Sequence, residues 1–137
     1  MAVDAVVMGL GRFGGGLAAA ESLLVEGRQV LVTDLAEEAA LQATVTKLRE
    51  TFGAQVSFRL GGHEQEDFAQ ADLVIANPAV PQPWDNPYLQ TAWASGATVT
   101  TEIARTLDQL SDRKTIAITG SAGKSTTTAM AHAALVA

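Results

Sequence analysis

Cysteine is absent from this chain of 137 residues, and histidine occurs only twice, as His63 and His132. Without cysteine, the sequence excludes disulfides, thiolate nucleophiles and zinc–thiolate sites. The two histidines do not make the cluster of ligands that a metal centre requires.

Positive charge is also scarce. Nine Lys and Arg residues stand against fifteen Asp and Glu residues, which gives a net charge of −6, and no basic run occurs. The chain has no basic patch of the kind that binds nucleic acids or anionic membranes, so we expect neither partner. No basic residue accompanies Trp84 or Trp93. We therefore interpret both as packing residues rather than as base-stacking platforms.

Long apolar runs are missing as well. No stretch approaches the roughly 20 apolar residues that a membrane-spanning helix needs, and the first residues lack the basic and apolar regions of a signal peptide. The composition, 47% hydrophobic and 18% charged, is that of a globular α/β protein that can build a core. We expect a cytoplasmic protein.

The glycines are not scattered: three of them form a Gly-x-Gly-x-x-Gly pattern at residues 9–14. An apolar run at residues 2–8 predicts a central strand before the pattern, and a helix is predicted after it, to about Glu26. In this context Gly9 permits a tight turn, Gly11 lets the backbone approach a diphosphate, and Gly14 lets the helix lie close to the strand.

A second predicted strand, residues 29–33, ends at Asp34. An acidic residue about 20 positions after the glycines can accept hydrogen bonds from a ribose or a base. The combination predicts a site for a dinucleotide or a nucleotide diphosphate. The alternative is a purely structural strand–turn–helix unit.

The remaining pattern alternates short apolar runs with helical periodicity, over residues 1–110. It predicts a Rossmann-like doubly wound parallel sheet of about five strands in the order 3-2-1-4-5. The further strands are expected at residues 57–60, 73–76 and 97–100, and the further helices at residues 37–52, 67–71, 87–95 and 102–110.

In this strand order the first and fourth strands are neighbours, so the loops after them flank a crevice at their carboxyl ends. Asn77, Pro78 and Ala79 follow the fourth strand. The Asn77 side chain has two interpretations, a hydrogen bond to a ligand or a cap on its own turn. His63 follows the third strand, and we favour a solvated loop residue over a ligand contact.

A second glycine loop begins at residue 120. Residues 115–119 predict a buried strand, the loop consists of Gly120, Ser121, Ala122 and Gly123, and a helix is expected from Lys124. This is the layout of a phosphate-binding loop. Lys124 would contact the β- and γ-phosphates of a nucleotide, and the hydroxyl of Ser125 is placed to coordinate Mg²⁺.

One strand and one helix cannot bury their own apolar faces. We therefore interpret residues 111–114 as a linker and residues 115–137 as the start of a truncated second domain. The isolated unit is expected to be disordered, to dock on the first domain, or to pair with another copy of the chain.

Two phosphate-type loops about 110 residues apart form a more specific signal than either loop alone. With Asn77-Pro78-Ala79 and Thr101-Glu102-Ile103, they make the chain resemble the Mur ligases, the ATP-dependent amino-acid ligases of peptidoglycan precursor synthesis, and most of all the branch that adds D-glutamate to UDP-N-acetylmuramoyl-L-alanine. The resemblance implies a UDP-substrate-binding domain followed by an ATP-binding central domain.

The resemblance also implies roles for individual residues. The UDP moiety would be bound by Gly9, Leu10, Gly11, Arg12, Phe13, Gly14, Asp34, Asn77, Pro78 and Ala79. ATP would be bound by Gly120, Ser121, Ala122, Gly123, Lys124, Ser125 and Thr126, with Lys124 as the catalytic residue and Ser125 on Mg²⁺.

In the family, ATP phosphorylates the substrate carboxylate, and the amine of D-glutamate attacks the resulting acyl phosphate. Further metal ligands and the amino-acid-binding domain of such enzymes lie beyond residue 137. We therefore expect this chain alone to bind the UDP moiety at most and to be inactive as a ligase. The alternatives are a nicotinamide-dependent dehydrogenase or regulatory Rossmann domain, and a non-catalytic nucleotide-binding module.

Overall fold

The computed structural model describes residues 3–11, 14–110 and 112–136. It divides the chain into two units, Met1–Thr106 and Leu107–Ala137. Each unit is described by itself below. Among the described residues, no helix is long and apolar enough to cross a membrane.

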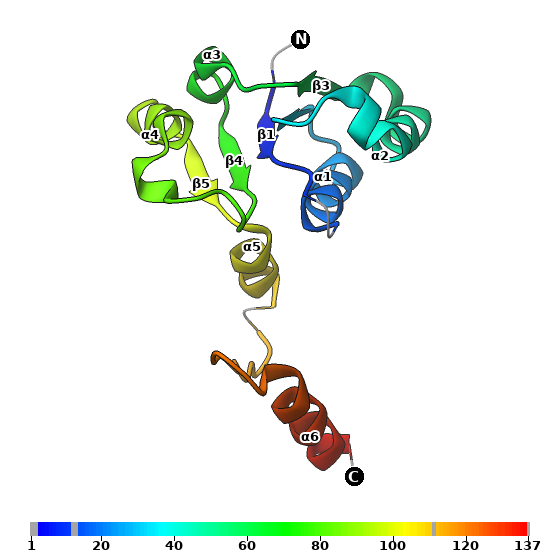
Figure 1. The fold of residues 1–137 in the computed structure, drawn as a ribbon, viewed down its shortest axis with the longest axis vertical. Helices are drawn as coiled ribbons and strands as arrows, with labels where there is room; N and C mark the ends of the chain where they lie inside the picture. Colours follow the sequence, from blue (N-terminus) through cyan, green and yellow to red (C-terminus); the bar gives the residue numbers. More distant parts are fainter. Residues whose placement is uncertain (1–2, 12–13, 111, 137) are drawn as a thin grey trace. The chain divides into compact units, whose positions relative to one another are not determined.

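The first unit is built around a five-stranded parallel sheet (Figure 1). The strands are β1 (Ala5–Met8), β2 (Val30–Asp34), β3 (Val56–Leu60), β4 (Leu73–Ala76) and β5 (Thr98–Thr100). Their order is β3-β2-β1-β4-β5. The predicted fold class and strand order are confirmed.

The central strand β1 pairs with β2 on one side and with β4 on the other. Its Val7 lies opposite Val32 of β2 and Ile75 of β4. Every residue of β1 and β4 is buried, whereas the edge strands β3 and β5 are partly exposed. Continuous apolar runs form the middle of the sheet because helices cover both of its faces.

Helices α1 (Gly15–Val25) and α2 (Glu38–Phe52) cover one face, and α3 (Gln65–Ala69) and α4 (Pro87–Ala94) cover the other (Figure 1). Two short 3₁₀ turns, η1 (Gly53–Gln55) and η2 (Pro83–Asp85), and the helix α5 (Glu102–Gln109) complete the connections. The predicted apolar face of α2 is confirmed, since Val45 and Leu48 are buried and Leu41 and Phe52 pack against the same core.

The two tryptophans are not packing residues, contrary to the sequence-based interpretation. Trp84 is 71% exposed and Trp93 is 46% exposed. Helix α4 instead buries Leu89 and Ala92, which are three positions apart and lie on one helical face. The sequence pattern predicts that Leu89 and Trp93, four positions apart, lie on the same buried face. The buried face instead contains Leu89 and Ala92.

The second unit contains the helix α6 (Lys124–Val136). The predicted strand at residues 115–119 is wrong: these residues form no strand, and Ile116 is 65% exposed. A parallel strand requires a neighbouring strand for its backbone N–H and C=O groups. No strand of the described chain pairs with this segment.

Candidate nucleotide site

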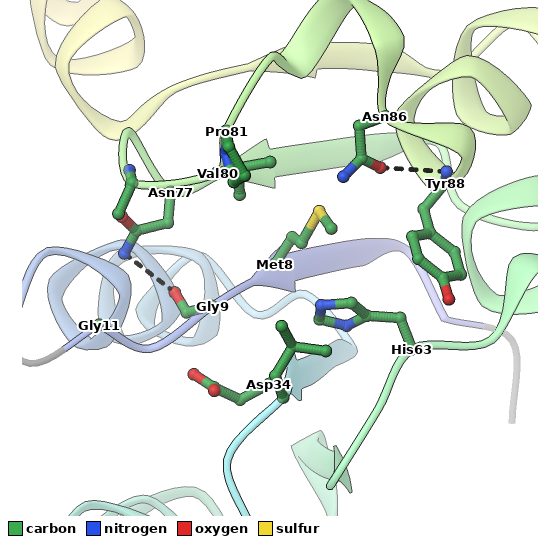
Figure 2. A pocket seen from close by; sticks show the side chains of 12 residues that line it. Met8, Gly9, Gly11, Asp34, His63, Asn77, Val80, Pro81, Asn86 and Tyr88 are labelled. Carbon is green, nitrogen blue, oxygen red and sulfur yellow. Dashed lines mark hydrogen bonds between the residues drawn. The ribbon is translucent and has the colours of Figure 1, made fainter.

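The loops after β1 and β4 meet at the carboxyl end of the sheet, and Asn77 joins them. Its backbone N–H donates to the carbonyl of Met8 at 3.0 Å, and its Nδ2 donates to the carbonyl of Gly9 at 3.3 Å (Figure 2). Its Oδ1 accepts a hydrogen bond from the N–H of Ala79 at 2.9 Å. The turn-capping interpretation of Asn77 is therefore confirmed, and the same side chain holds the glycine loop in place.

Glycine is required twice where this loop faces Asn77. Gly9 has a φ of +87°, and Gly11 a φ of +68°, a conformation that L side chains rarely adopt. A Cβ on Gly11 would lie 2.5 Å from Asn77 Nδ2. The close approach of the two loops therefore depends on the absence of a side chain at this position.

The close approach of helix α1 to the loop depends on Gly16 rather than on Gly14. A Cβ on Gly16 would lie 2.1 Å from the carbonyl oxygen of Gly9, whereas a Cβ on Gly14 would meet nothing within 4 Å among the described residues. The role predicted for Gly14 is thus wrong. Gly14 instead adopts a φ of +84° at the position before the helix begins.

Asp34 ends β2 and binds the glycine loop directly. Its Oδ2 accepts from the N–H of Leu10 at 2.8 Å, and its Oδ1 accepts from the N–H of Ala36 at 2.9 Å. The carboxylate therefore fixes the loop conformation. Each oxygen keeps further lone pairs, so Asp34 can hold the loop and accept a ligand hydroxyl at the same time.

These groups surround a cavity of about 340 Å³, within the usual size range of small-molecule sites. It lies over the carboxyl ends of β1, β2 and β4 (Figure 2). Its lining residues come from four loops, two strand ends and the start of α4: Met8, Gly9, Gly11, Asp34, Leu35, His63, Asn77, Ala79, Val80, Pro81, Asn86 and Tyr88.

His63 is one of the lining residues, and its interpretation as a solvated loop residue is wrong. Its Nδ1 lies 2.9 Å from the hydroxyl of Thr33, and its ring makes edge contacts with Phe68 and Tyr88 at centroid distances of 6.0 Å and 5.2 Å. Burial lowers the pKa of His63, although Asp34 and Asp67 oppose this effect. The imidazole is therefore neutral at pH 7.

Backbone N–H groups are the candidate anion-binding groups near the cavity. The N–H of Gly11, a lining residue, has no acceptor among the described residues; the N–H of Gly15, which begins helix α1 and does not line this cavity, has none either. Free N–H groups at a helix N-terminus favour a phosphate. The described residues that line the cavity include no Lys or Arg. Arg12 and Phe13, which were also predicted to bind the substrate, lie outside the described residues.

Residues 3–101 match a family model described as "Mur ligase MurD-like, N-terminal domain". The chain belongs to this MurD-like family. The family resemblance inferred from the two loops is thereby confirmed.

Relatives support the same assignment. The chain is 40% identical over 131 residues to the UDP-N-acetylmuramoylalanine--D-glutamate ligase of Roseiflexus sp. (strain RS-1), covering 96% of this chain and 27% of the relative. It is 43% identical over 129 residues to the same-named enzyme of Geobacter metallireducens, covering 91% of this chain and 26% of the relative. The chain thus spans about a quarter of the length of these relatives.

Among solved structures, a pseudomurein peptide ligase type C from Methanothermus fervidus aligns with 90% of this chain and 24% of its own, with a TM-score of 0.48 and 18% identity. The family model and the two ligase relatives give no support to the alternative of a nicotinamide-dependent dehydrogenase or regulatory Rossmann domain.

The second loop of this MurD-like chain lies in the second unit. Lys124 begins α6, and its Nζ donates to the carbonyl of Gly120 at 2.5 Å, so its side chain folds back across the loop. Gly123 has a φ of +77° just before the helix. The ammonium group, the N–H groups of the first helical turn and the Ser125 hydroxyl lie within a few residues of one another. This donor set suits a nucleotide phosphate.

Three hydrogen-bonding side chains at the first site escaped sequence reasoning, Thr33, Asn86 and Tyr88, as did the apolar lining residues Met8 and Leu35. Thr33 is the one polar side chain among the fully buried described residues of the core. A signal for it exists in the sequence, because it is the only hydroxyl in the apolar run that ends at Asp34. Asn86 and Tyr88 reach the cavity through the turn after β4 and the start of α4, and no sequence pattern indicated this.

Proposed function

We propose that this chain is the N-terminal part of an ATP-dependent ligase that adds D-glutamate to UDP-N-acetylmuramoyl-L-alanine in peptidoglycan precursor synthesis. One observation carries the proposal: the glycine loop, Asp34 and Asn77 form the wall of one cavity at the switch point of the sheet. Doubly wound sheets bind nucleotides at this point. The relatives' activity, a UDP-N-acetylmuramoylalanine--D-glutamate ligase, supports this choice of substrate.

In this proposal the first unit binds the UDP half of the substrate. The free N–H groups of Gly11 and Gly15 face the diphosphate, and Asp34 accepts a hydrogen bond from the uridine. Asn77, Pro78 and Ala79 form the opposite wall. Gly9, Leu10 and Gly14 set the loop geometry, and Arg12 and Phe13 are proposed as further contacts to the UDP moiety, on the family resemblance alone.

The second loop, Gly120, Ser121, Ala122 and Gly123 with Lys124, Ser125 and Thr126, is proposed to hold MgATP. Lys124 would exchange its hydrogen bond to Gly120 for the phosphates, and Ser125 would contribute a hydroxyl to Mg²⁺. When bound, MgATP supplies the phosphoryl group that activates the substrate carboxylate. The role of the Lys124 ammonium is to stabilise the negative charge of the transferring group.

We further propose that the 137-residue chain alone binds the uridine nucleotide without ligase activity, and that the reaction takes place in the cytoplasm, where ATP is available. ADP release that depends on D-glutamate would contradict the expected inactivity. A second copy of the chain is proposed as an additional partner, through the exposed apolar side chains of the second unit.

Isothermal titration of the purified chain with UDP-N-acetylmuramoyl-L-alanine, NAD⁺ and MgATP tests the proposal. Heat is expected with the muramoyl nucleotide and not with NAD⁺. A matched variant, Gly11→Ala, should abolish this heat because its Cβ would displace Asn77, whereas Gly62→Ala, which meets nothing within 4 Å, should leave it unchanged. Heat with NAD⁺ alone would contradict the proposed substrate.

A further inference from the structure

Thr33 and His63 make a pair whose hydrogen-bond direction can be assigned. Thr33 lies near the end of β2 and is fully buried. Its hydroxyl has one partner among the described residues, Nδ1 of His63 at 2.9 Å. The distance alone is compatible with either group as the donor.

Burial decides the direction. If Nδ1–H donated, the hydroxyl hydrogen of Thr33 would remain buried without an acceptor, which costs about 1–3 kcal/mol. If Thr33 donates, both groups are satisfied. A neutral imidazole carries a hydrogen on only one nitrogen, so Nε2 then carries it. The pKa of His63, which burial lowers, is consistent with this neutral form.

The ring is also fixed in orientation. Its edge contacts with Phe68 of α3 and Tyr88 of α4 leave it little rotational freedom. Figure 2 shows the ring extending from its Cβ into the cavity, between Met8 and Asp34. Nε2 is on the ring edge away from Cβ and has no partner among the described residues. A fixed N–H donor therefore points into the cavity.

His63 lies on the opposite side of the cavity from Gly11 (Figure 2). If the diphosphate binds at the glycine loop, the base of the same nucleotide extends to the His63 end of the cavity. The edge of the base that is furthest from the ribose then faces His63. In uracil that edge carries the O4 carbonyl, an acceptor, whereas in cytosine it carries an amino group, a donor. An N–H group on the protein can donate to the O4 carbonyl of uracil, whereas it faces another donor in the amino group of cytosine.

We propose that Thr33 and His63 form a carbonyl-selective pair: Thr33 donates to Nδ1, and the Nε2–H of His63 donates to the O4 carbonyl of the bound uracil. This inference rests on the proposed function, which supplies the uridine nucleotide. It adds the residue that makes the site select uracil over cytosine. Thr33 is the positioning residue, and His63 contacts the base.

The tautomer can be tested without any ligand, by ¹⁵N NMR of the imidazole nitrogens at pH 7.5. The chain has only two histidines, so the His132→Ala variant assigns the His63 signals. We expect a protonated Nε2 and an unprotonated Nδ1. A protonated Nδ1 would overturn the proposal, whatever the chain binds.

The selectivity is tested by titrating UDP and CDP into the full chain. We expect UDP to bind about tenfold more tightly than CDP, the equivalent of one good hydrogen bond. His63→Phe keeps a ring against Tyr88 and should remove the preference by weakening UDP alone. His63→Gln places an amide N–H near the position of Nε2 and should restore part of it, whereas His63→Asn is too short and should not.

A second pair of variants keeps the test valid if changes at His63 impair folding. Thr33→Val removes the hydroxyl at nearly constant volume and should reduce the preference, while Thr33→Ser should retain it. An unchanged preference in both His63→Phe and Thr33→Val would overturn this inference and leave the proposed function intact. If neither UDP nor UDP-N-acetylmuramoyl-L-alanine binds the wild-type chain, the proposed function fails, and the inference fails with it.

Discussion

At the scale of single residues, Gly16 shows how strongly one missing side chain constrains the site. Its Cβ would overlap the carbonyl oxygen of Gly9 at 2.1 Å and the backbone of Leu10 at 2.6 Å. Both contacts are with backbone atoms, which cannot turn aside as a flexible side chain can. Helix α1 can therefore begin directly under the loop only because residue 16 is glycine.

Gly16→Ala is expected to lower the free energy of unfolding by about 3 kcal/mol, since overpacking forces the backbone to shift. Urea unfolding measures this change. Gly62→Ala, whose Cβ would meet open space, is the control and should change stability little. Equal stability of the two variants would show that the loop relaxes around the added methyl group.

His63 makes the stability of the fold depend on pH. Because burial lowers its pKa in the folded chain, the unfolded chain binds a proton first as the pH falls below the ordinary value of 6.5. The free energy of unfolding therefore decreases from pH 7.5 to pH 5.5, and the contribution is absent above that window. Urea unfolding at the two pH values should show a larger decrease for the wild type than for His63→Phe. The pKa of Glu26, which its hydrogen bond to Arg105 lowers, affects the free energy of unfolding at more acidic pH, as the pH falls below the ordinary glutamate value of 4.5.

At the scale of elements, helix α4 depends on the residue before it. The Oδ1 of Asn86 accepts hydrogen bonds from the N–H groups of Tyr88 and Leu89, at 3.1 and 3.2 Å, and Pro87 occupies the first helical position. This cap fixes the start of α4 and thereby the place of Tyr88 against His63. Asn86 therefore lines the cavity and also positions Tyr88, a second lining residue.

Asn86→Ala should lower the free energy of unfolding by about 1 kcal/mol, the usual cost of losing a helix cap. Asn86→Asp keeps the acceptor oxygen and should retain most of the stability. Thermal unfolding of the two variants side by side measures the difference. A loss of equal size in both would show that the Asn86 amide, and not its Oδ1, is the stabilising group.

At the scale of the whole chain, the buried core belongs to the first unit. Both hydrophobic clusters consist of residues between Val3 and Val99, and α6 has no buried residue. A variant that ends at residue 110 should therefore unfold cooperatively at the same temperature as the full chain and bind the uridine nucleotide equally well. A fall of its melting temperature by more than a few degrees would show that the second unit stabilises the first.

The second unit exposes Ile116, Met130 and Leu135 to between 65% and 71%. Such side chains favour association with a complementary apolar surface. Light scattering at rising concentration should give a mass above that of the monomer, and the variant that ends at residue 110 should remain monomeric. A constant monomer mass for the full chain would exclude pairing through this unit.

For the first unit, the sequence by itself determined the strands and helices and their order. Apolar runs such as residues 5–8 and 73–76 can only be buried when both faces of the sheet are covered, and Gly9 and Gly11 allow the positive φ values that the loop after β1 needs. Strand order, the position of the crevice and the family assignment follow from these local constraints. Local patterns were therefore sufficient to predict the fold of the first unit and the loops of its site.

Only the tertiary structure decided which side chains meet across the sheet. Thr33, His63 and Tyr88 belong to three separate segments, and neither periodicity nor a motif relates them. The same holds for Gly16, whose requirement arises from the backbone of Gly9 and not from its own helix, and for residues 115–119, which have strand composition but no strand to pair with. Local composition sets conformational preference, whereas contacts, burial and the direction of a hydrogen bond depend on neighbours that are distant in sequence.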